Sequence, residues 1–311
     1  QAALLTTLKR IGRVEPSVVL SPWSGEPYEY RSRARLAVAA DGRLGFRRSR
    51  GREVVSITAC GVLAPALQQS IASLGNHRLA AKARDLELNM VTDGQTVAAA
   101  WRGHGPKPSV PKLRWAGPVK TEPAPLTMDG IDLHPLVFTQ ANPAGNLAIR
   151  AQLDQWLSTL APVQTAVELY AGSGNFTLVL SAHASATACY ESAADAVTLA
   201  RRALPEHVEL SVASAEAAVA RRTGPVDVVL VDPPRSGLTP EVADGLTAWA
   251  QRALLYVSCD PATFARDAAR WAAQGWRLAE VRLFDLYPQT AHSEVAGLFL
   301  PRTAPNGHLN G

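Results

Sequence analysis

Hydrophobic residues recur at every second position in two segments of the first third of the chain. Residues 34, 36 and 38 are apolar, Asp41-Gly42 interrupts the run, and residues 44 and 46 are apolar again. Residues 86–101 repeat this pattern around Asp93-Gly94. A period of two belongs to β-strands, and an Asp-Gly pair is typical of a hairpin turn. Residues 63–74, between the hairpins, have the spacing of an amphipathic helix. The pattern predicts an antiparallel α+β domain.

The pattern changes after residues 103–125, which contain six prolines and are typical of a connector. Beyond the connector, strand-like apolar runs alternate with segments that have helical spacing. We expect strands at residues 165–170, 187–191, 208–214, 226–232 and 253–258. We expect helices at residues 143–160, 193–203, 240–252 and 261–274. This alternation is typical of a doubly wound, mostly parallel sheet. Residues 279–286 and 295–300 leave no room for a crossover helix, which predicts an antiparallel edge. The predicted domains are residues 1–128, connector included, and residues 129–311.

Composition narrows the class of protein. Of 311 residues, 47% are hydrophobic and 19% charged, which excludes disordered and fibrous chains and leaves a globular protein. The longest apolar runs are strand-length, so we expect no membrane span. Three cysteines cannot form a paired disulfide framework and no secretory signal opens the chain, which predicts the cytoplasm. Because the first residue is Gln1 and not Met, we expect a fragment or a processed form.

Positive charge is concentrated in the first hairpin, although the net charge is only +4. One acid, Asp41, lies among eight arginines: Arg31, Arg33, Arg35, Arg43, Arg47, Arg48, Arg50 and Arg52. A cluster of one sign is typical of a nucleic-acid footprint. The alternative is a solvated hairpin face.

A glycine-rich turn, Gly172-Ser-Gly174, lies between a predicted strand and a predicted helix. Backbone N–H groups there can approach a ligand, but Thr177 occupies the third glycine position of the dinucleotide fingerprint, which argues against nicotinamide and flavin cofactors. Glu191, 19 residues beyond Gly172, ends the next strand, where a carboxylate can accept hydrogen bonds from ribose hydroxyls. The alternative is a purely structural strand-to-helix turn.

Two further strand ends carry candidate chemistry. Asp232-Pro-Pro-Arg235 follows an apolar strand, and its prolines stiffen a loop at the edge where open α/β sheets bind ligands. Cys259 lies between a strand and a helix that begins with proline, which suits a nucleophile. The alternatives are a structural loop for Asp232 and a buried small hydrophobe for Cys259. Cys189, inside an apolar strand, is expected to be core.

Segments in order along the chain resemble the motifs of the S-adenosylmethionine-dependent RNA 5-methyluridine (uracil-C5) methyltransferases. These are Phe138-Thr-Gln-Ala-Asn142, Tyr170-Ala-Gly-Ser-Gly-Asn-Phe176, Asp232-Pro-Pro-Arg-Ser-Gly237, Val257-Ser-Cys-Asp-Pro261 and Tyr287-Pro-Gln-Thr-Ala-His-Ser-Glu294. The resemblance implies a Rossmann-like methyltransferase domain acting on ribosomal RNA, more than on transfer RNA. It implies Cys259 as nucleophile and Glu294 as base. It also implies that S-adenosylmethionine is bound by Gln140, Tyr170, Asn175, Glu191, Ser214 and Asp232, and the glycine turn adds Gly172 to these cofactor residues.

The chemistry of this family explains the residue types. Uracil C5 is a poor nucleophile until a thiolate, here Cys259, adds at C6. The C5 proton must then leave before the cysteine is eliminated, and a carboxylate such as Glu294 can remove it. Because both faces of the base are used, we expect the target nucleotide to be flipped out of its stack. His292 is open to three roles: structural, contacting the substrate, or tuning the base.

Three features depart from the family pattern. Asp260 stands where asparagine is usual, and a carboxylate beside Cys259 would raise the thiol pKa. Cys60 resembles the last of four iron–sulfur ligands, but one cysteine cannot hold a cluster, so the other ligands would have to precede Gln1. The alternative is that the cluster is absent and Cys60 is an isolated structural cysteine. The N-terminal RNA-binding β-barrel found in some relatives would likewise have to precede Gln1. We expect a monomer that binds RNA and no membrane. A protein that binds or folds RNA with little catalysis is the alternative function.

Overall fold

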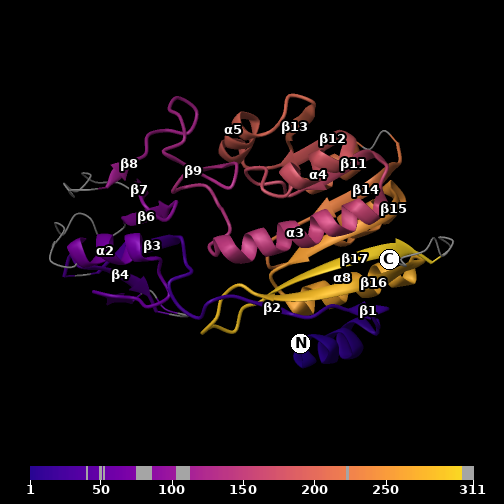
Figure 1. The fold of residues 1–311 in the computed structure, drawn as a ribbon, viewed down its shortest axis with the longest axis horizontal. Helices are drawn as coiled ribbons and strands as arrows, with labels where there is room; N and C mark the ends of the chain where they lie inside the picture. The colour runs from indigo at the N-terminus through magenta and orange to yellow at the C-terminus, as the bar shows by residue number, and fades with distance from the viewer. Residues whose placement is uncertain are drawn as a thin grey trace. The chain divides into compact units, whose positions relative to one another are not determined.

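The computed structural model describes residues 1–39, 41–48, 51, 53–74, 86–102, 113–221 and 224–302. These residues form two compact units, drawn in Figure 1: one comprises residues 1–25 with residues 144–311, and the other residues 26–143. The described helices include none long and apolar enough to cross a bilayer.

The smaller unit, residues 26–143, is built on a six-stranded sheet in the order β5-β4-β3-β6-β7-β8. Its elements are β3 (Arg33–Val38), β4 (Leu44–Arg47), β5 (Val54–Ser56), α2 (Pro65–Leu74), β6 (Glu87–Thr92), β7 (Val97–Arg102), β8 (Arg114–Trp115), β9 (Leu126–Met128) and β10 (Ile131–Leu133). Helix α2 buries Leu67, Ile71 and Leu74 against apolar side chains of β3, β6 and β7. This packing explains the apolar spacing of residues 63–74.

Both predicted hairpins are confirmed, because β3 pairs antiparallel with β4 and β6 with β7. Gly42 and Gly94 adopt positive φ angles of 83° and 101° in the turns, a conformation that favours glycine. The predicted connector is wrong in part. Residues 103–112 lie outside the described residues, but Arg114–Trp115 forms a strand that pairs parallel with β7. A two-residue strand is too short to show a period in the sequence.

The larger unit contains a nine-stranded sheet in the order β1-β16-β17-β15-β14-β11-β12-β13, with β2 also paired to β16. Its strands are β1 (Val18–Val19), β2 (Trp23–Ser24), β11 (Val163–Leu169), β12 (Ala184–Glu191), β13 (Val208–Val212), β14 (Val226–Val231), β15 (Ala250–Ser258), β16 (Trp276–Asp285) and β17 (Glu294–Pro301). Strands β11 to β15 pair in parallel, and β17 is antiparallel to both β15 and β16. The predicted doubly wound, mostly parallel sheet is confirmed. The antiparallel pair is not the edge, because β1 and β2 pair with the outer side of β16.

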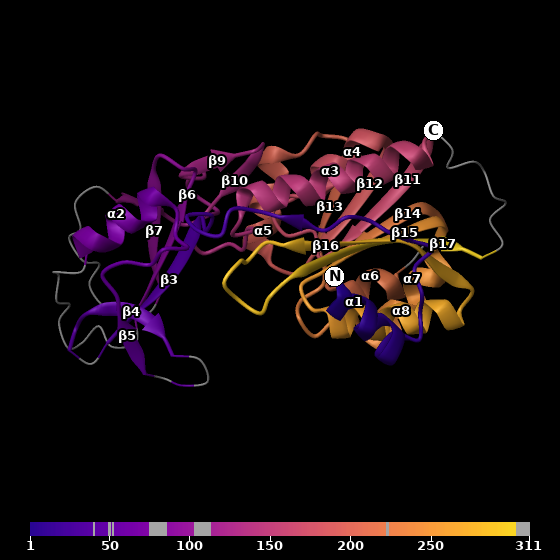
Figure 2. The ribbon, with the colours of Figure 1, turned by 60° about the horizontal axis from the view of Figure 1, so that its bottom comes forward.

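Helices cover both faces of this sheet (Figure 2). They are α1 (Ala2–Thr7), α3 (Pro143–Leu160), α4 (Thr177–His183), α5 (Ala194–Ala203), α6 (Ala215–Ala220), α7 (Pro240–Trp249) and α8 (Pro261–Ala273). Apolar side chains of α3 and α4 share one core with the sheet, and those of α1, α6, α7 and α8 share another. The four predicted helices are confirmed within a few residues. The short helices α4 and α6 were not predicted, because each is too short for a clear helical period.

The first 25 residues pack in the larger unit, which differs from the predicted boundary at residue 128. Strands β1 and β2 pair in parallel with β16, more than 250 residues away in the sequence. Helix α1 continues into the π-helical turn Leu8–Gly12, and a Cβ at Gly12 would lie 2.8 Å from the Ala265 carbonyl oxygen of α8. This contact requires glycine. Two-residue strands with a distant partner leave no periodic signal in the sequence.

Candidate active site

The predicted site residues of the larger unit lie at the ends of neighbouring strands. In sheet order, Glu294 begins β17, Cys259 follows β15, Asp232 follows β14, Tyr170 follows β11 and Glu191 ends β12. Parallel strands place their carboxyl ends along one edge, and the antiparallel β17 brings its first residue to the same edge. Neighbouring strands are about 5 Å apart, so Cys259 and the turn after β11 are separated by about 10 Å.

Cys259 and Glu294 occupy facing positions on adjacent strands. The antiparallel register pairs Ser258 of β15 with Val295 of β17, so the next position along the ladder brings Cys259 opposite Glu294. Cys259 is half-buried, whereas the Glu294 side chain is 3% exposed. One carboxylate oxygen of Glu294, Oε2, is buried without a hydrogen-bond partner among the described residues. A buried acceptor left unsatisfied is costly. Here it belongs to the residue that the register sets opposite Cys259.

Burial and mutual repulsion set the charge states of this group. Burial raises the pKa of Glu294 to about 7, and the Arg235 guanidinium limits the rise. Burial, together with the carboxylates of Glu294 and Asp232, raises the pKa of the Cys259 thiol to about 11, and Arg235 again opposes the rise. Burial also raises the pKa of Asp232 well above its usual range. Cys259 is therefore a protonated thiol at neutral pH, beside a carboxyl group that titrates there.

Asp260 does not act on the thiol as the sequence suggested. Its carboxylate oxygen Oδ1 accepts hydrogen bonds from the backbone N–H groups of Ala262 and Thr263, at 2.8 and 3.0 Å, and so caps the N-terminus of α8. An asparagine could make the same cap. The carboxylates that raise the Cys259 pKa are instead those of Glu294 and Asp232.

The turn after β11 has a left-handed backbone and leaves free space beside Gly172. Tyr170 and Gly172 adopt positive φ angles of 63° and 57°, and a Cβ built on Gly172 meets no atom within 4 Å. Left-handed backbone at a tyrosine costs free energy and is frequent at ligand sites. The Gly172 N–H donates to Glu191 Oε2 at 3.0 Å, while Glu191 Oε1 accepts from the Ala193 N–H and the Ser192 hydroxyl. The Glu191 carboxylate therefore joins the turn to the end of β12.

Asn175 is fixed by a partner that the sequence analysis did not identify. Its side-chain amide exchanges two hydrogen bonds with Asn146 in the first turn of α3, at 2.7 and 2.9 Å. Below the turn, the Thr177 hydroxyl donates to Glu168 Oε2 at 2.5 Å, and burial raises the pKa of Glu168 to about 8. These bonds anchor the glycine turn to α3 and to the core.

The other two predicted cofactor residues differ in their placement. Ser214 lies at the same edge, because it follows β13 and the Ala213 N–H before it donates to the Glu191 carbonyl at 3.0 Å. Ser214 caps α6, where its hydroxyl accepts from the Ala217 N–H at 3.2 Å, so its side chain has a structural role in the free protein. Gln140 is buried in the smaller unit, in the segment between β10 and α3. Its assignment to the cofactor stays a prediction.

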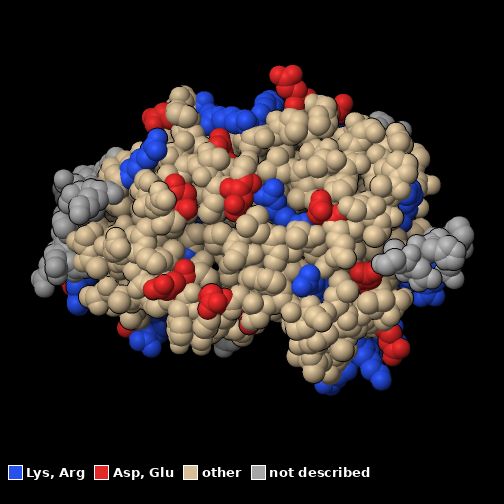
Figure 3. Space-filling model, viewed as in Figure 1, with Lys and Arg blue, Asp and Glu red and all other residues tan. Residues whose placement is uncertain are grey.

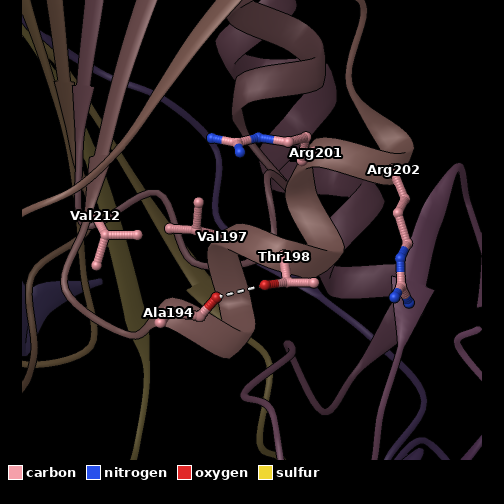
Figure 4. Close-up of a pocket in the computed structure, with 6 residues that line it drawn as sticks. All are labelled: Ala194, Val197, Thr198, Arg201, Arg202 and Val212. Atoms are coloured by element: carbon pink, nitrogen blue, oxygen red, sulfur yellow. Dashed lines mark hydrogen bonds between the residues drawn. The ribbon is translucent and has the colours of Figure 1, made fainter. Parts of the chain in front are cut away.

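A pocket of about 300 Å³ lies along α5 (Figure 4). It is lined by Ala194, Val197, Thr198, Arg201, Arg202 and Val212. Val212 is the register partner of Glu191, so the pocket borders the Glu191 end of the sheet, and its strand, β13, is four strands from β15, which precedes the thiol. This pocket is therefore separate from the position of Cys259.

The arginine-rich hairpin is less strongly positive than its sequence predicts. Three of its arginines pair with carboxylates, one of which comes from another strand: Arg43 with Asp41 at 2.6 Å, Arg48 with Glu53 of the same loop at 2.8 Å, and Arg47 with Glu87 of β6 at 3.7 Å. Arg31 and Arg33 donate to backbone carbonyls, Arg35 is exposed, and Arg50 and Arg52 lie outside the described residues. On the face drawn in Figure 3, charges of both signs are interspersed.

The remaining cysteines show no ligand site. Cys189 is buried, and its thiol contacts the Thr177 hydroxyl, which confirms it as core. Cys60 is partly buried beside the core of the smaller unit. Within the described ranges, no three His, Cys, Asp or Glu side chains are grouped so as to hold a metal ion. Cys60 alone does not fit an iron–sulfur cluster.

Two further functional candidates are Arg235, to which the sequence analysis gave no role, and His292, for which it left three roles open. Arg235 Nη2 lies 3.3 Å from His292 Nε2. Both residues stood in the recognised motifs, but nothing in the sequence indicates that they meet, because 57 positions separate them.

Comparisons with known proteins agree on one family. The model of the tRNA (Uracil-5-)-methyltransferase family matches residues 221–303. The 23S rRNA (uracil(1939)-C(5))-methyltransferase RlmD of Alkalilimnicola ehrlichii is 32% identical over 96% of this chain and 76% of that protein. RlmD of Pseudomonas aeruginosa is 33% identical over 96% of this chain and 74% of that protein.

A solved structure shows the same fold. The tRNA (uracil-54, C5)-methyltransferase of Pyrococcus abyssi, in complex with S-adenosyl-L-homocysteine, matches with a TM-score of 0.72 at 24% identity, over 96% of this chain and 82% of that chain. The expected Rossmann-like methyltransferase architecture, preceded by an α+β region, is confirmed. With relatives above 30% identity along nearly its whole length, the chain belongs to the S-adenosylmethionine-dependent RNA uracil-C5 methyltransferase family.

Proposed function

We propose that this chain transfers a methyl group from S-adenosylmethionine to C5 of a uridine in structured RNA through a covalent bond between Cys259 Sγ and uracil C6. The observation that carries the proposal is the register of β15 and β17, which sets the half-buried thiol opposite a buried carboxylate with an unsatisfied oxygen. A thiol and a carboxylate at facing positions are the two groups that addition and proton removal require.

The cofactor fits the edge formed by β11 and β12. The open space at Gly172 admits a ligand close to the backbone, and the Glu191 carboxylate is fixed where it can accept from ribose hydroxyls. We assign cofactor binding to Gln140, Tyr170, Gly172, Asn175, Glu191, Ser214 and Asp232, with Gln140 and Ser214 assigned from the family resemblance alone. When bound, S-adenosylmethionine supplies an electrophilic methyl group.

Each protein group then has one task. Cys259 gives its thiol proton to solvent water and adds to C6 as a thiolate, and the C5=C6 electron pair becomes the enolate that makes C5 nucleophilic. After C5 has taken the methyl group, Glu294 removes the C5 proton, and the electron pair of that C–H bond expels the Cys259 thiolate. With its pKa raised to about 7, Glu294 is about half ionised at neutral pH and fully ionised above it, and its carboxylate is a stronger base than an ordinary one. Its burial suits a group that must take a proton from carbon.

Ribosomal RNA is the proposed substrate, ahead of transfer RNA. The support is that relatives at 30–33% identity over most of the chain carry the name 23S rRNA methyltransferase. We further propose a monomer acting in the cytoplasm, which sedimentation and cell fractionation test. Incubation of the protein and labelled cofactor with unmodified ribosomal or transfer RNA, followed by nucleoside analysis, should place label in 5-methyluridine from ribosomal RNA.

Label in ribose or in an exocyclic amine would contradict this chemistry, and label from transfer RNA alone would reverse the substrate. The alternative function, binding or folding of RNA with little catalysis, predicts no label. It also predicts that Cys259→Ala leaves RNA binding and the RNA-dependent phenotype unchanged.

A further inference from the structure

The hydrogen bond between Arg235 and His292 crosses the end of the strand that carries the thiol. Arg235 lies in the loop that follows β14, and His292 lies in the loop that precedes β17. In the sheet, β15 lies between these two strands. A bond joining the two outer loops must therefore span the end of β15, where Cys259 is located.

The chemistry of the pair fixes the form of the histidine. A guanidinium group only donates hydrogen bonds, so His292 Nε2 must be the acceptor and the ring must be neutral with its proton on Nδ1. The His292 backbone is held as well, since its N–H donates to the Thr290 hydroxyl at 3.2 Å, and that hydroxyl donates to the Tyr287 carbonyl at 2.7 Å. The imidazole is thus presented from an ordered turn.

The position of the cation has a consequence for both reacting groups. Arg235 lowers the pKa of Cys259 and of Glu294, opposing the effects of burial. Arg235 is itself exposed, and an exposed arginine with no fixed partner samples many rotamers. His292 restricts that freedom. Three ionisable side chains act on the thiol: Asp232 after β14 and Glu294 of β17, which raise its pKa, and the cation Arg235, which lowers it.

We propose that His292 is a positioning residue whose neutral imidazole holds the Arg235 guanidinium across the end of β15, beside Cys259 and Glu294. The inference rests on the proposed roles of Cys259 and Glu294. It selects one of the three roles left open for His292, namely tuning of the reactive groups, and it acts through Arg235 and not by contact with the base.

Alkylation of the free protein tests the proposal without RNA or cofactor. The full chain is treated with iodoacetamide between pH 7 and 9, and peptide mass mapping gives the rate at Cys259, with Cys60 as the internal reference. His292→Leu should slow alkylation of Cys259 by about two- to fivefold at pH 8, because a cation that leaves the site stabilises the thiolate less. His292→Gln should retain the parent rate, since its amide oxygen can accept the same hydrogen bond.

Arg235→Gln provides the second arm. It should slow alkylation at least as much as His292→Leu, and the double variant should be no slower than Arg235→Gln, because His292 has no effect once the cation is gone. His183→Leu is the matched control: its ring bonds to Asp154, away from the site, and its loss should leave Cys259 unchanged. Thermal unfolding of each variant checks that the fold is intact.

Parent-rate alkylation in His292→Leu, or a double variant slower than Arg235→Gln by the full factor of His292→Leu, would overturn the positioning role. The proposed function fails separately, if Cys259→Ala still methylates RNA. In that case the alkylation rates would still report whether His292 positions Arg235.

Discussion

Removing the charge of Glu294 should make Cys259 more reactive toward alkylation, although the same change abolishes the proposed base. Facing side chains on adjacent strands have Cβ atoms about 5 Å apart, so two charges about 6 Å apart repel by roughly 3 kcal/mol at an effective dielectric of about 20. Because Cys259 is half-buried, solvent screening reduces this to about 1 kcal/mol. Glu294→Gln should therefore raise the thiolate fraction about fivefold.

The rate gain is smaller than the gain in thiolate, because a less basic thiolate is also less nucleophilic. With a Brønsted coefficient of about 0.45, the fivefold gain becomes an increase of about two- to threefold in the alkylation rate. The effect also has a defined pH dependence. Below pH 7 the parent's Glu294 is protonated and resembles glutamine, so the two rates should coincide, and they should separate as pH rises through about 7.

Asp260→Asn is the matched control for this measurement. It removes a carboxylate from the residue next to Cys259, but that carboxylate caps α8 and asparagine can replace it there. Its alkylation rate should equal the parent's. The electrostatic account would be refuted if Glu294→Gln alkylates at the parent rate at pH 9, or if Asp260→Asn gives the larger acceleration.

Three further predictions concern the cofactor turn, the hairpin and the core. Gly172→Ala should weaken binding of S-adenosylhomocysteine at least about tenfold by calorimetry, whereas Gly275→Ala, also at a positive φ in open space, should affect only stability; equal affinities would remove the turn from the cofactor site. Charge reversal at Arg47 and Arg48 should weaken RNA binding and reduce the salt slope by about one for each lost phosphate contact; an unchanged slope would indicate a solvated face. Asp267→Ala should lower the free energy of unfolding by about 2 to 4 kcal/mol in urea, because the Tyr256 hydroxyl and the Leu238 N–H lose their buried acceptor, and a loss below about 1 kcal/mol would contradict this.

Much of the larger unit could be predicted because its information is local. Strands buried on both faces are continuous apolar runs, and their ends are marked by the residues that carry the chemistry, as at Asp232 and Cys259. Once a parallel sheet was expected, these ends had to meet at one edge. That Cys259 and Glu294 face each other could not be predicted from the strand ends alone, because it depends on the insertion of β17 between β15 and β16.

What the sequence could not provide were contacts between distant segments. The arginines of the hairpin looked unopposed in part because Glu87, the partner of Arg47, lies on β6, far along the chain. Asp260 looked like a neighbour of the thiol, but helix capping turned its carboxylate to the backbone of α8. In both cases the distance along the chain did not identify the contact that the side chain makes.

The central claim, a covalent bond between Cys259 and the uracil, is tested most directly by trapping it. Glu294→Gln keeps the thiol and removes the base, so addition and methyl transfer can proceed while release is blocked. With cofactor and RNA, this variant should accumulate a protein–RNA adduct that survives denaturing electrophoresis, and mass mapping should place the bond at Cys259. The double variant with Cys259→Ala should form none. Turnover of Glu294→Gln at the parent rate without an adduct, or an adduct that persists without Cys259, would contradict the account.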